Sequence, residues 1–432
     1  MSLRRDFLFL VFAGSTVVYL QLAPTLTVLG GDIPSLLGRD VAPTVRDYVG
    51  LELTCLAFFQ IPLVALYLGW RDGTGGRPRT AFVVHPGRAR ILARSSVVWV
   101  LAFAFALYRN DYLFTRIGSE GASAKVLALP PLDYVIIRGY QTSALFLIAT
   151  LYVLRLRTTS PQLRGVLSRA LGVNLGIWLL YSVVNSRAAV LVTALLLLGI
   201  SLACRQDLPR VPKRLLIRLA LVGVVAVYGM VVTTNIRTGF SGALTVSPRD
   251  LTQLSSAAVS DAPIRLNCVN LMSQLKPGVV ADGPSWGGAW APAKWYVWRY
   301  VDPEGFDEFR ASLRTSAKAH LMAEFLGFSP PDYYSCALTD LYGNFDVGGL
   351  LGGAVLFGGI FLWWARQSSR PASGRRYLLA LFAVTHALLF DQEAMFVMFG
   401  WLPQLPFVAA IIALGPLVVE RLETSPPPAP ED

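Results

Sequence analysis

The sequence has few charged residues and few of the side chains that hold metals or carry redox chemistry. Charged residues make up 15% of its 432 positions, against roughly 25% in soluble domains. Its three histidines are spread over separate segments, so no histidine-based metal site is predicted. It has no phosphate-binding Walker loop and no glycine-rich dinucleotide turn. Asp32, Asp40 and Asp47 are too far apart to form an acidic pair, which argues against a metal-dependent glycosyltransferase. We therefore expect no cofactor and no metal.

Long apolar runs are abundant instead. Hydrophobic residues make up 54% of the chain, and the mean hydropathy is +0.52. A membrane-spanning helix needs about 20 such residues, which predicts an all-α polytopic membrane protein with ten spans. The basic start followed by an apolar run is interpreted as an uncleaved first span. We place the spans at residues 7–29, 48–70, 92–108, 132–154, 168–186, 188–204, 215–236, 347–365, 377–399 and 402–420.

The basic residues indicate the orientation of these spans. The net charge of +11 comes largely from four connectors, 71–94, 155–169, 205–218 and 366–376, in which the only acids are Asp72 and Asp207. Since arginine and lysine are enriched in cytoplasmic loops, this alternation predicts that both termini are cytoplasmic. The same charge is explained by topology, so no nucleic-acid partner is expected.

One loop on the outer side is much longer than the others. Residues 238–346 are expected to form short helices packed over the membrane core as a lid, because their aromatic content argues against disorder. The domains are then helices one to seven in 1–237, the lid in 238–346, helices eight to ten in 347–420 and a disordered tail in 421–432. Cys268 and Cys336 lie in this loop, either as a disulfide or as two thiols.

Three arginines are predicted at a similar depth near the outer side. Arg187 opens a span in "NSRAAVLV", Arg237 ends one in "VTTNIRTGF", and Arg138 lies inside one in "LDYVIIRGYQTS". Each one by itself is equally well explained as a side chain that reaches the lipid headgroups. Together, without a matching group of acids, they favour an anion site, because the guanidinium group fits phosphate geometry.

Two further patterns lie in the long loop. "TDLYGNFDVGG" places Asp340, Tyr342 and Asn344 before a glycine-rich span, and Asp340 is a candidate general base. On the local sequence alone, a helix-capping or turn acid is the favoured interpretation of Asp340. In "SWGGAWAPAKWYVWRY", Trp295 and Trp298 are candidates for stacking on sugar rings, although an interfacial aromatic belt explains this stretch equally well.

These motifs, in this order, resemble the bacterial oligosaccharide repeat-unit polymerases, the Wzy-type O-antigen polymerases, and more distantly the O-antigen ligases. "SRAAVLVTALLL" is similar to the family's Ser-Arg at the start of a span, and "NIRTGF" to the arginine before the large loop. "DLYGNFDVGG" is similar to the segment that closes that loop. Asp340 stands where the family usually has Glu, and Asp346 where it has Gly.

The resemblance implies a membrane glycosyltransferase architecture of the GT-C kind in the bacterial inner membrane, with the large loop in the periplasm. It implies polymerisation of repeat units that are carried on undecaprenyl diphosphate. One lipid-linked oligosaccharide is the donor and another is the acceptor. Membrane lipids and a chain-length regulator protein are the other implied partners. The diphosphate would be bound by Arg187, Arg237, Arg138 and Arg299, and the glycan by Trp295, Trp298, Tyr342 and Asn344. The base would be Asp340, with His320 and Glu324 as alternatives because they share one helical face.

Two other functions stay open. A ligase that transfers glycan to lipid A-core tends to carry a functional histidine in the large loop, and His320 is such a histidine. A non-enzymatic transporter of lipid-linked glycans usually has internal symmetry between its halves, and the sequence has no internal repeat.

Overall fold

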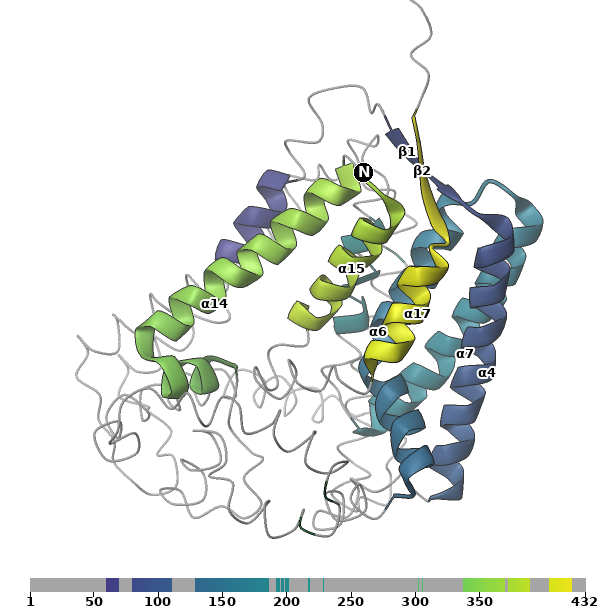
Figure 1. Cartoon of the computed structure of the whole chain (residues 1–432), viewed down its shortest axis with the longest axis horizontal. Helices are drawn as coiled ribbons and strands as arrows, with labels where there is room; N and C mark the ends of the chain where they lie inside the picture. The colour runs from purple at the N-terminus through teal and green to yellow at the C-terminus, as the bar shows by residue number, and fades with distance from the viewer. Residues whose placement is uncertain are drawn as a thin grey trace, which may run out of the picture.

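The computed structural model is mainly helical in the part of the chain that it describes (Figure 1). That part comprises residues 60–69, 80–110, 129–185, 192–194, 196–197, 199–201, 217, 228, 302, 305, 337–369, 372–388 and 404–421. Its labelled helices are α4 (Pro86–Arg109), α6 (Pro131–Arg157), α7 (Pro161–Asn185), α14 (Ala337–Ser369), α15 (Gly374–Leu388) and α17 (Leu405–Leu414). Two more short apolar helices span Gln60–Gly69 and Val192–Ser201. Proline opens α4, α6 and α7, where its missing N–H leaves no intrahelical hydrogen bond unmade.

Four described helices, α4, α6, α7 and α14, are long and apolar enough to cross a membrane. They match the predicted spans 92–108, 132–154, 168–186 and 347–365, and thus support a helical membrane protein. The helices Gln60–Gly69, Val192–Ser201 and α17 lie within three more predicted spans, and α15 overlaps the span predicted at 377–399 but begins before it. As described, each of these helices is shorter than a full span. The span predicted at 7–29 lies outside the described residues, and that at 215–236 is described only at Ile217 and Tyr228.

The prediction of a tenth span over 402–420 is wrong in its second half, and the chain is not entirely α-helical. The helix α17 ends at Gly415, which adopts a left-handed backbone conformation (φ 56°), and Pro416 follows. Glycine accepts this conformation without a steric cost, and proline does not continue a helix. The next residues form β2 (Leu417–Arg421), which pairs in antiparallel register with β1 (Thr80–Val84). The apolar residues after Gly415 thus belong to a two-stranded sheet.

This sheet lies at the end of the described helices where most of their arginine residues are found. Phe82 of β1 packs on Tyr377 of α15, and the Arg157 guanidinium at the end of α6 lies over the Phe82 ring. Arg88, near the start of α4, donates a hydrogen bond to the Gly415 carbonyl at the end of α17. We call this side the arginine-rich end, defined by Arg88, Arg90, Arg94, Arg155, Arg157, Arg164, Arg169, Arg366, Arg375 and Arg376.

The helices run in the directions that the charge pattern predicts. At the arginine-rich end α4, α7 and α15 begin, whereas α6, α14 and α17 end there. Interhelical contacts fix this arrangement: Tyr152 of α6 bonds Ser201, and Trp178 of α7 bonds Thr193, at the two ends of the helix Val192–Ser201. The described parts of the predicted connectors 71–94, 155–169 and 366–376 therefore lie at one end of the described helices, and that this end is cytoplasmic stays a prediction.

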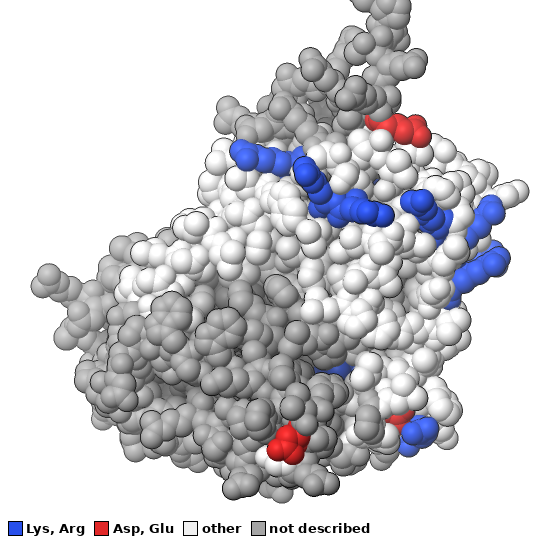
Figure 2. Space-filling model, in the orientation of Figure 1, with Lys and Arg blue, Asp and Glu red and all other residues white. Residues whose placement is uncertain are grey.

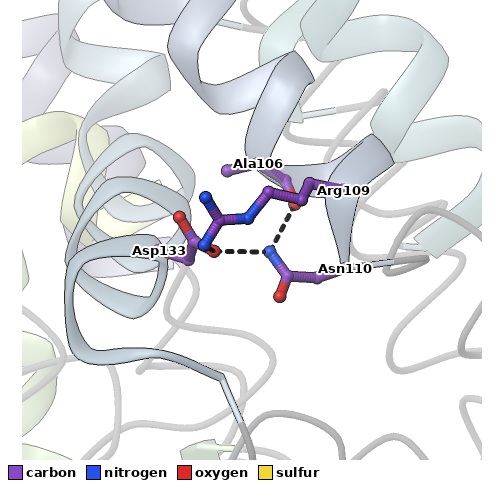
Figure 3. Close-up of polar contacts among 4 residues, drawn as sticks. All are labelled: Ala106, Arg109, Asn110 and Asp133. Carbon is purple, nitrogen blue, oxygen red and sulfur yellow. Dashed lines mark hydrogen bonds and ion pairs between the residues drawn. The ribbon is translucent and has the colours of Figure 1, made fainter.

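The core forms where α4, α6 and α7 pack together. Tyr140 of α6 is buried and donates a hydrogen bond to Asn174 of α7, whose amide donates in turn to Ser96 of α4. At the opposite end, where α4 finishes and α6 begins, Arg109 forms an ion pair with Asp133 (Figure 3). Polar groups that meet across helices in this way hold the helices in register, because lipid offers them no other partner.

Candidate functional site

Arg138, the described member of the predicted anion site, lies on α6 about two turns from its start, and Gln141 lies on the same face one turn further on. The Arg138 guanidinium donates a hydrogen bond to the Gln141 side-chain oxygen at 3.2 Å. The Gln141 amide then donates to the Tyr181 hydroxyl of α7 at 2.6 Å. Arg138 is partly buried, and this chain of side chains fixes its direction. The structure therefore holds the one predicted arginine that it describes in an ordered, polar setting.

A second pair of buried polar groups meets α6 just beyond Arg138. His386 of α15 accepts a hydrogen bond at Nε2 from Gln404, which stands directly before α17, with an N–N distance of 2.7 Å. Its Nδ1 lies 2.8 Å from the Phe382 carbonyl oxygen, so this nitrogen carries the proton. The backbone of Thr142 also lies close to the His386 ring.

The chain of three side chains that begins at Arg138 and the pair of His386 and Gln404 form one polar layer. The Thr142 hydroxyl donates to the Arg138 carbonyl, so the His386 contact and the Arg138 side chain are one helical turn apart on α6. We use the term polar layer for Arg138, Gln141, Tyr181, His386 and Gln404. It combines a fixed cation with a buried imidazole that donates on one side and accepts on the other. Such groups within a helical membrane protein mark substrate paths, or bind helices to one another.

The glycine-rich motif lies at a sharp bend in α14. Figure 1 shows the first turns of α14 bent away from its long straight part. A Cβ atom on Gly349 would overlap the Leu341 carbonyl oxygen and lie 2.7 Å from the Phe345 Cβ. Glycine is therefore required at 349, because the bend brings two segments of the helix into contact there. Asp340, Tyr342 and Asn344 belong to the bent first turns of α14.

Most of the other predicted site residues lie outside the described part of the chain. These are Arg187, Arg237, Arg299, Trp295, Trp298, His320 and Glu324, together with Cys268 and Cys336. Of the predicted diphosphate ligands, the structure thus positions the side chain of Arg138 alone. Within the described residues, no group of three or more acidic, histidine or cysteine side chains is arranged to hold a metal ion.

Four members of the polar layer were not predicted from the sequence. No role follows from the sequence for Gln141, Tyr181 or Gln404, and His386 is one of the three histidines that are spread over separate segments. The available signal was their polarity within otherwise apolar runs, which is costly in a membrane unless the groups are paired or used. What the sequence does not contain is the pairing: Gln141 and Tyr181 are 40 residues apart, and His386 and Gln404 are 18 apart.

The fold and this layer indicate a helical membrane protein with a small group of polar side chains inside an apolar core. No known family model matches the chain, and neither the curated proteins nor the solved structures include a similar one.

Proposed function

We propose that this protein is a membrane glycosyltransferase that polymerises oligosaccharide repeat units carried on undecaprenyl diphosphate. It would act at the outer face of the bacterial inner membrane, with both termini cytoplasmic and the loop 238–346 periplasmic. The proposal rests on the ordered motifs around Arg187, Arg237 and Asp340. The structural observation that supports it most is the Arg138 guanidinium, held by Gln141 and Tyr181 on the half of α6 away from the arginine-rich end.

The proposed reaction needs a cation for the leaving group and a base for the acceptor. The acceptor sugar hydroxyl attacks the anomeric carbon of the donor chain, and the bond from that carbon to the diphosphate oxygen breaks. The bonding electrons leave with the diphosphate, so Arg138, Arg187, Arg237 and Arg299 would stabilise the developing charge. The hydroxyl proton would pass to the Asp340 carboxylate, the first candidate base.

Two properties of this chemistry agree with the sequence. The leaving group is already a diphosphate, so no nucleotide or metal is required, and none is predicted. Of the remaining predicted residues, four would bind the glycan: Trp295, Trp298, Tyr342 and Asn344. The other two, His320 and Glu324, are alternative bases.

The first test is the glycan profile of a strain that lacks this gene. Loss of polymerase leaves single lipid-linked repeat units, whereas loss of ligase leaves full-length polymer on its lipid carrier. A strain in which repeat units fail to reach the outer face would instead support the transporter. The wild-type gene on a plasmid should restore the polymer, and the result that refutes the proposal is a normal polymer in the deletion strain.

The second test uses variants of Arg138 in that strain. Replacing Arg138 with Ala removes charge-assisted contacts worth about 1.5–3 kcal/mol each, so the polymerisation rate should fall about ten- to a hundredfold. Arg138→Lys keeps the charge but not the planar fork, and should also be impaired. Tyr181→Phe removes the hydroxyl that holds Gln141 and should give a smaller loss.

The matched control is Arg90→Lys, a charge-conserving change at the arginine-rich end, and it should make wild-type polymer. Polymer length is read on a gel and normalised to the amount of protein in the membrane. Wild-type polymer from well-expressed Arg138→Ala would remove Arg138 from the proposed site.

A further inference from the structure

The arginines of the arginine-rich end fall into two groups by their contacts. One group serves the protein itself: Arg88 bonds the Gly415 carbonyl, Arg155 bonds Ser168, Arg164 bonds the Thr158 carbonyl, and Arg157 lies over the Phe82 ring. The other group consists of Arg90, Arg94, Arg169, Arg366, Arg375 and Arg376. These six side chains are exposed, and none is ion-paired within the part of the chain that the structure describes.

The second group continues the exposed apolar stripes of the helices. On α4, Arg94 is followed at helical spacing by Val98, Leu101 and Phe105, which are 69%, 53% and 63% exposed. Residues spaced by three or four lie on the same face of a helix. A helix face this apolar and this exposed is suited to acyl chains rather than water. Arg90 and Arg94 thus sit where such a face reaches the membrane surface.

Three other helices repeat this arrangement. On α7, Arg169 precedes exposed Val173 and Leu180 on the same face. On α15, Arg375 and Arg376 precede exposed Leu379. On α14, which runs the other way, Arg366 follows exposed Val355 by three turns. The same pattern on four helices, always at one end, places six guanidinium groups at that end of the described helices, a set that we call the ring.

The charge of this ring is poorly balanced. Figure 2 shows most of the visible basic side chains in one band across the upper part of the molecule, near the strands of Figure 1. Among the described residues, Glu420 of β2 is the one carboxylate side chain placed at this end. At the opposite end the described arginine, Arg109, is paired with Asp133. The two ends therefore differ in the charge they offer to lipid headgroups.

We propose that this ring binds the phosphate groups of anionic phospholipids in the leaflet that covers the arginine-rich end. We define the anionic-lipid ring as Arg90, Arg94, Arg169, Arg366, Arg375 and Arg376. Guanidinium groups bind phosphate through paired hydrogen bonds, while the acyl chains of the same lipid lie on the apolar stripe beside each arginine. Phosphatidylglycerol has a net negative charge, whereas the phosphate of zwitterionic phosphatidylcholine is offset by its own choline cation, so the ring should favour phosphatidylglycerol.

The test measures how strongly the protein prefers phosphatidylglycerol over phosphatidylcholine. The full-length protein is reconstituted into vesicles that contain the two lipids, one of them brominated, and quenching of tryptophan fluorescence reports which lipid is in contact. Each basic residue near a membrane surface is worth about fivefold in binding. The wild-type protein should therefore prefer phosphatidylglycerol, and added salt should weaken this preference.

Two triple variants separate a ring from a single site. Arg90→Gln with Arg94→Gln and Arg169→Gln changes α4 and α7, whereas Arg366→Gln with Arg375→Gln and Arg376→Gln changes α14 and α15. Each triple should lower the preference severalfold. The corresponding Lys triples keep the charge and should retain most of it. Glu420→Gln, which removes the opposing charge, should raise it.

Three outcomes would overturn the proposal: a wild-type protein without a preference, a preference that does not respond to salt, or Gln triples that both behave like wild type. The first two need no variant, so the proposal stays testable even if a triple variant misfolds. The measurement does not depend on the proposed enzymatic function, because it uses no glycan substrate.

Discussion

The two partners of the ion pair between Arg109 and Asp133 are unequally exposed, so we expect their substitutions to lower the stability of the protein by different amounts. The Arg109 side chain is 55% exposed and the Asp133 side chain 7%, with 2.9 Å between Nη2 and Oδ2. Asn110 donates a second hydrogen bond to the same Asp133 oxygen at 2.8 Å and also bonds the Ala106 carbonyl (Figure 3). These contacts tie the end of α4 to the start of α6. Removing either partner should loosen that junction, but by different amounts.

The difference follows from what each substitution leaves behind. Arg109→Ala leaves a buried carboxylate with Asn110 as its remaining described donor, and breaking such a pair costs about 3–5 kcal/mol when both ions are buried. We expect about 3 kcal/mol, because Arg109 is half exposed. Asp133→Ala leaves a guanidinium that water can solvate, so it should cost only about 1–1.5 kcal/mol. The double variant should be more stable than Arg109→Ala alone, since it no longer buries an unpaired charge.

Heating in detergent, followed by size-exclusion chromatography of the protein that stays monodisperse, ranks these variants. A ranking is the suitable readout because membrane proteins often unfold irreversibly. The expected order of stability is wild type, Asp133→Ala, the double variant close to it, and Arg109→Ala last. If Arg109→Ala survived heating as well as Asp133→Ala, or if the double variant were the least stable, the assignment of the cost to the buried carboxylate would be wrong.

Two further predictions concern the packing of α14 and the core. Gly349→Ala should cost about 1–3 kcal/mol because its Cβ would overlap the Leu341 carbonyl oxygen, whereas Gly348→Ala has open space and should be nearly neutral in the same heating assay. Equal melting of the two variants would contradict the bend. Asn174→Ala should cost about 1–2 kcal/mol because the buried Tyr140 hydroxyl loses its shorter acceptor and keeps only the 3.5 Å contact to the backbone carbonyl at position 174, and adding Tyr140→Phe should recover part of this loss. No recovery would mean that Asn174 acts through other contacts.

The sequence predicts the long helices well because their signal is local. A run of apolar residues the length of a bilayer needs no knowledge of its partners, and α4, α6, α7 and α14 match such runs. The arginine-rich connectors predict the helix directions for the same reason. The error at 402–420 has the opposite cause: Leu417, Val418 and Val419 continue the apolar run before them, and only their pairing with residues 80–84, far away in the chain, makes them part of a strand.

The candidate site is less predictable because its geometry depends on register between helices. The position of Arg138 inside a span was readable, but its partners Gln141 and Tyr181 follow from how α6 packs on α7. The bend of α14 is an intermediate case. Small residues let helices approach closely, and Gly358 does so, since a Cβ there would lie 2.9 Å from Ile61 Cγ2 on the helix Gln60–Gly69, whereas Gly349 makes its close approach within its own helix.

The polar layer differs from the Tyr140–Asn174–Ser96 contacts in how fully its polar groups are satisfied. In the core, Tyr140, Asn174 and Ser96 satisfy one another, which is what helix-to-helix attachment requires. In the polar layer, Gln404 is fully buried and donates to His386, yet its Oε1 atom accepts no hydrogen bond within the part of the chain that the structure describes. A buried acceptor left over in this way is costly. Trp99 Nε1 and Ser182 Oγ are likewise buried without a hydrogen bond among the described residues, so the Gln404 oxygen agrees with a binding role for the layer but does not by itself single the layer out.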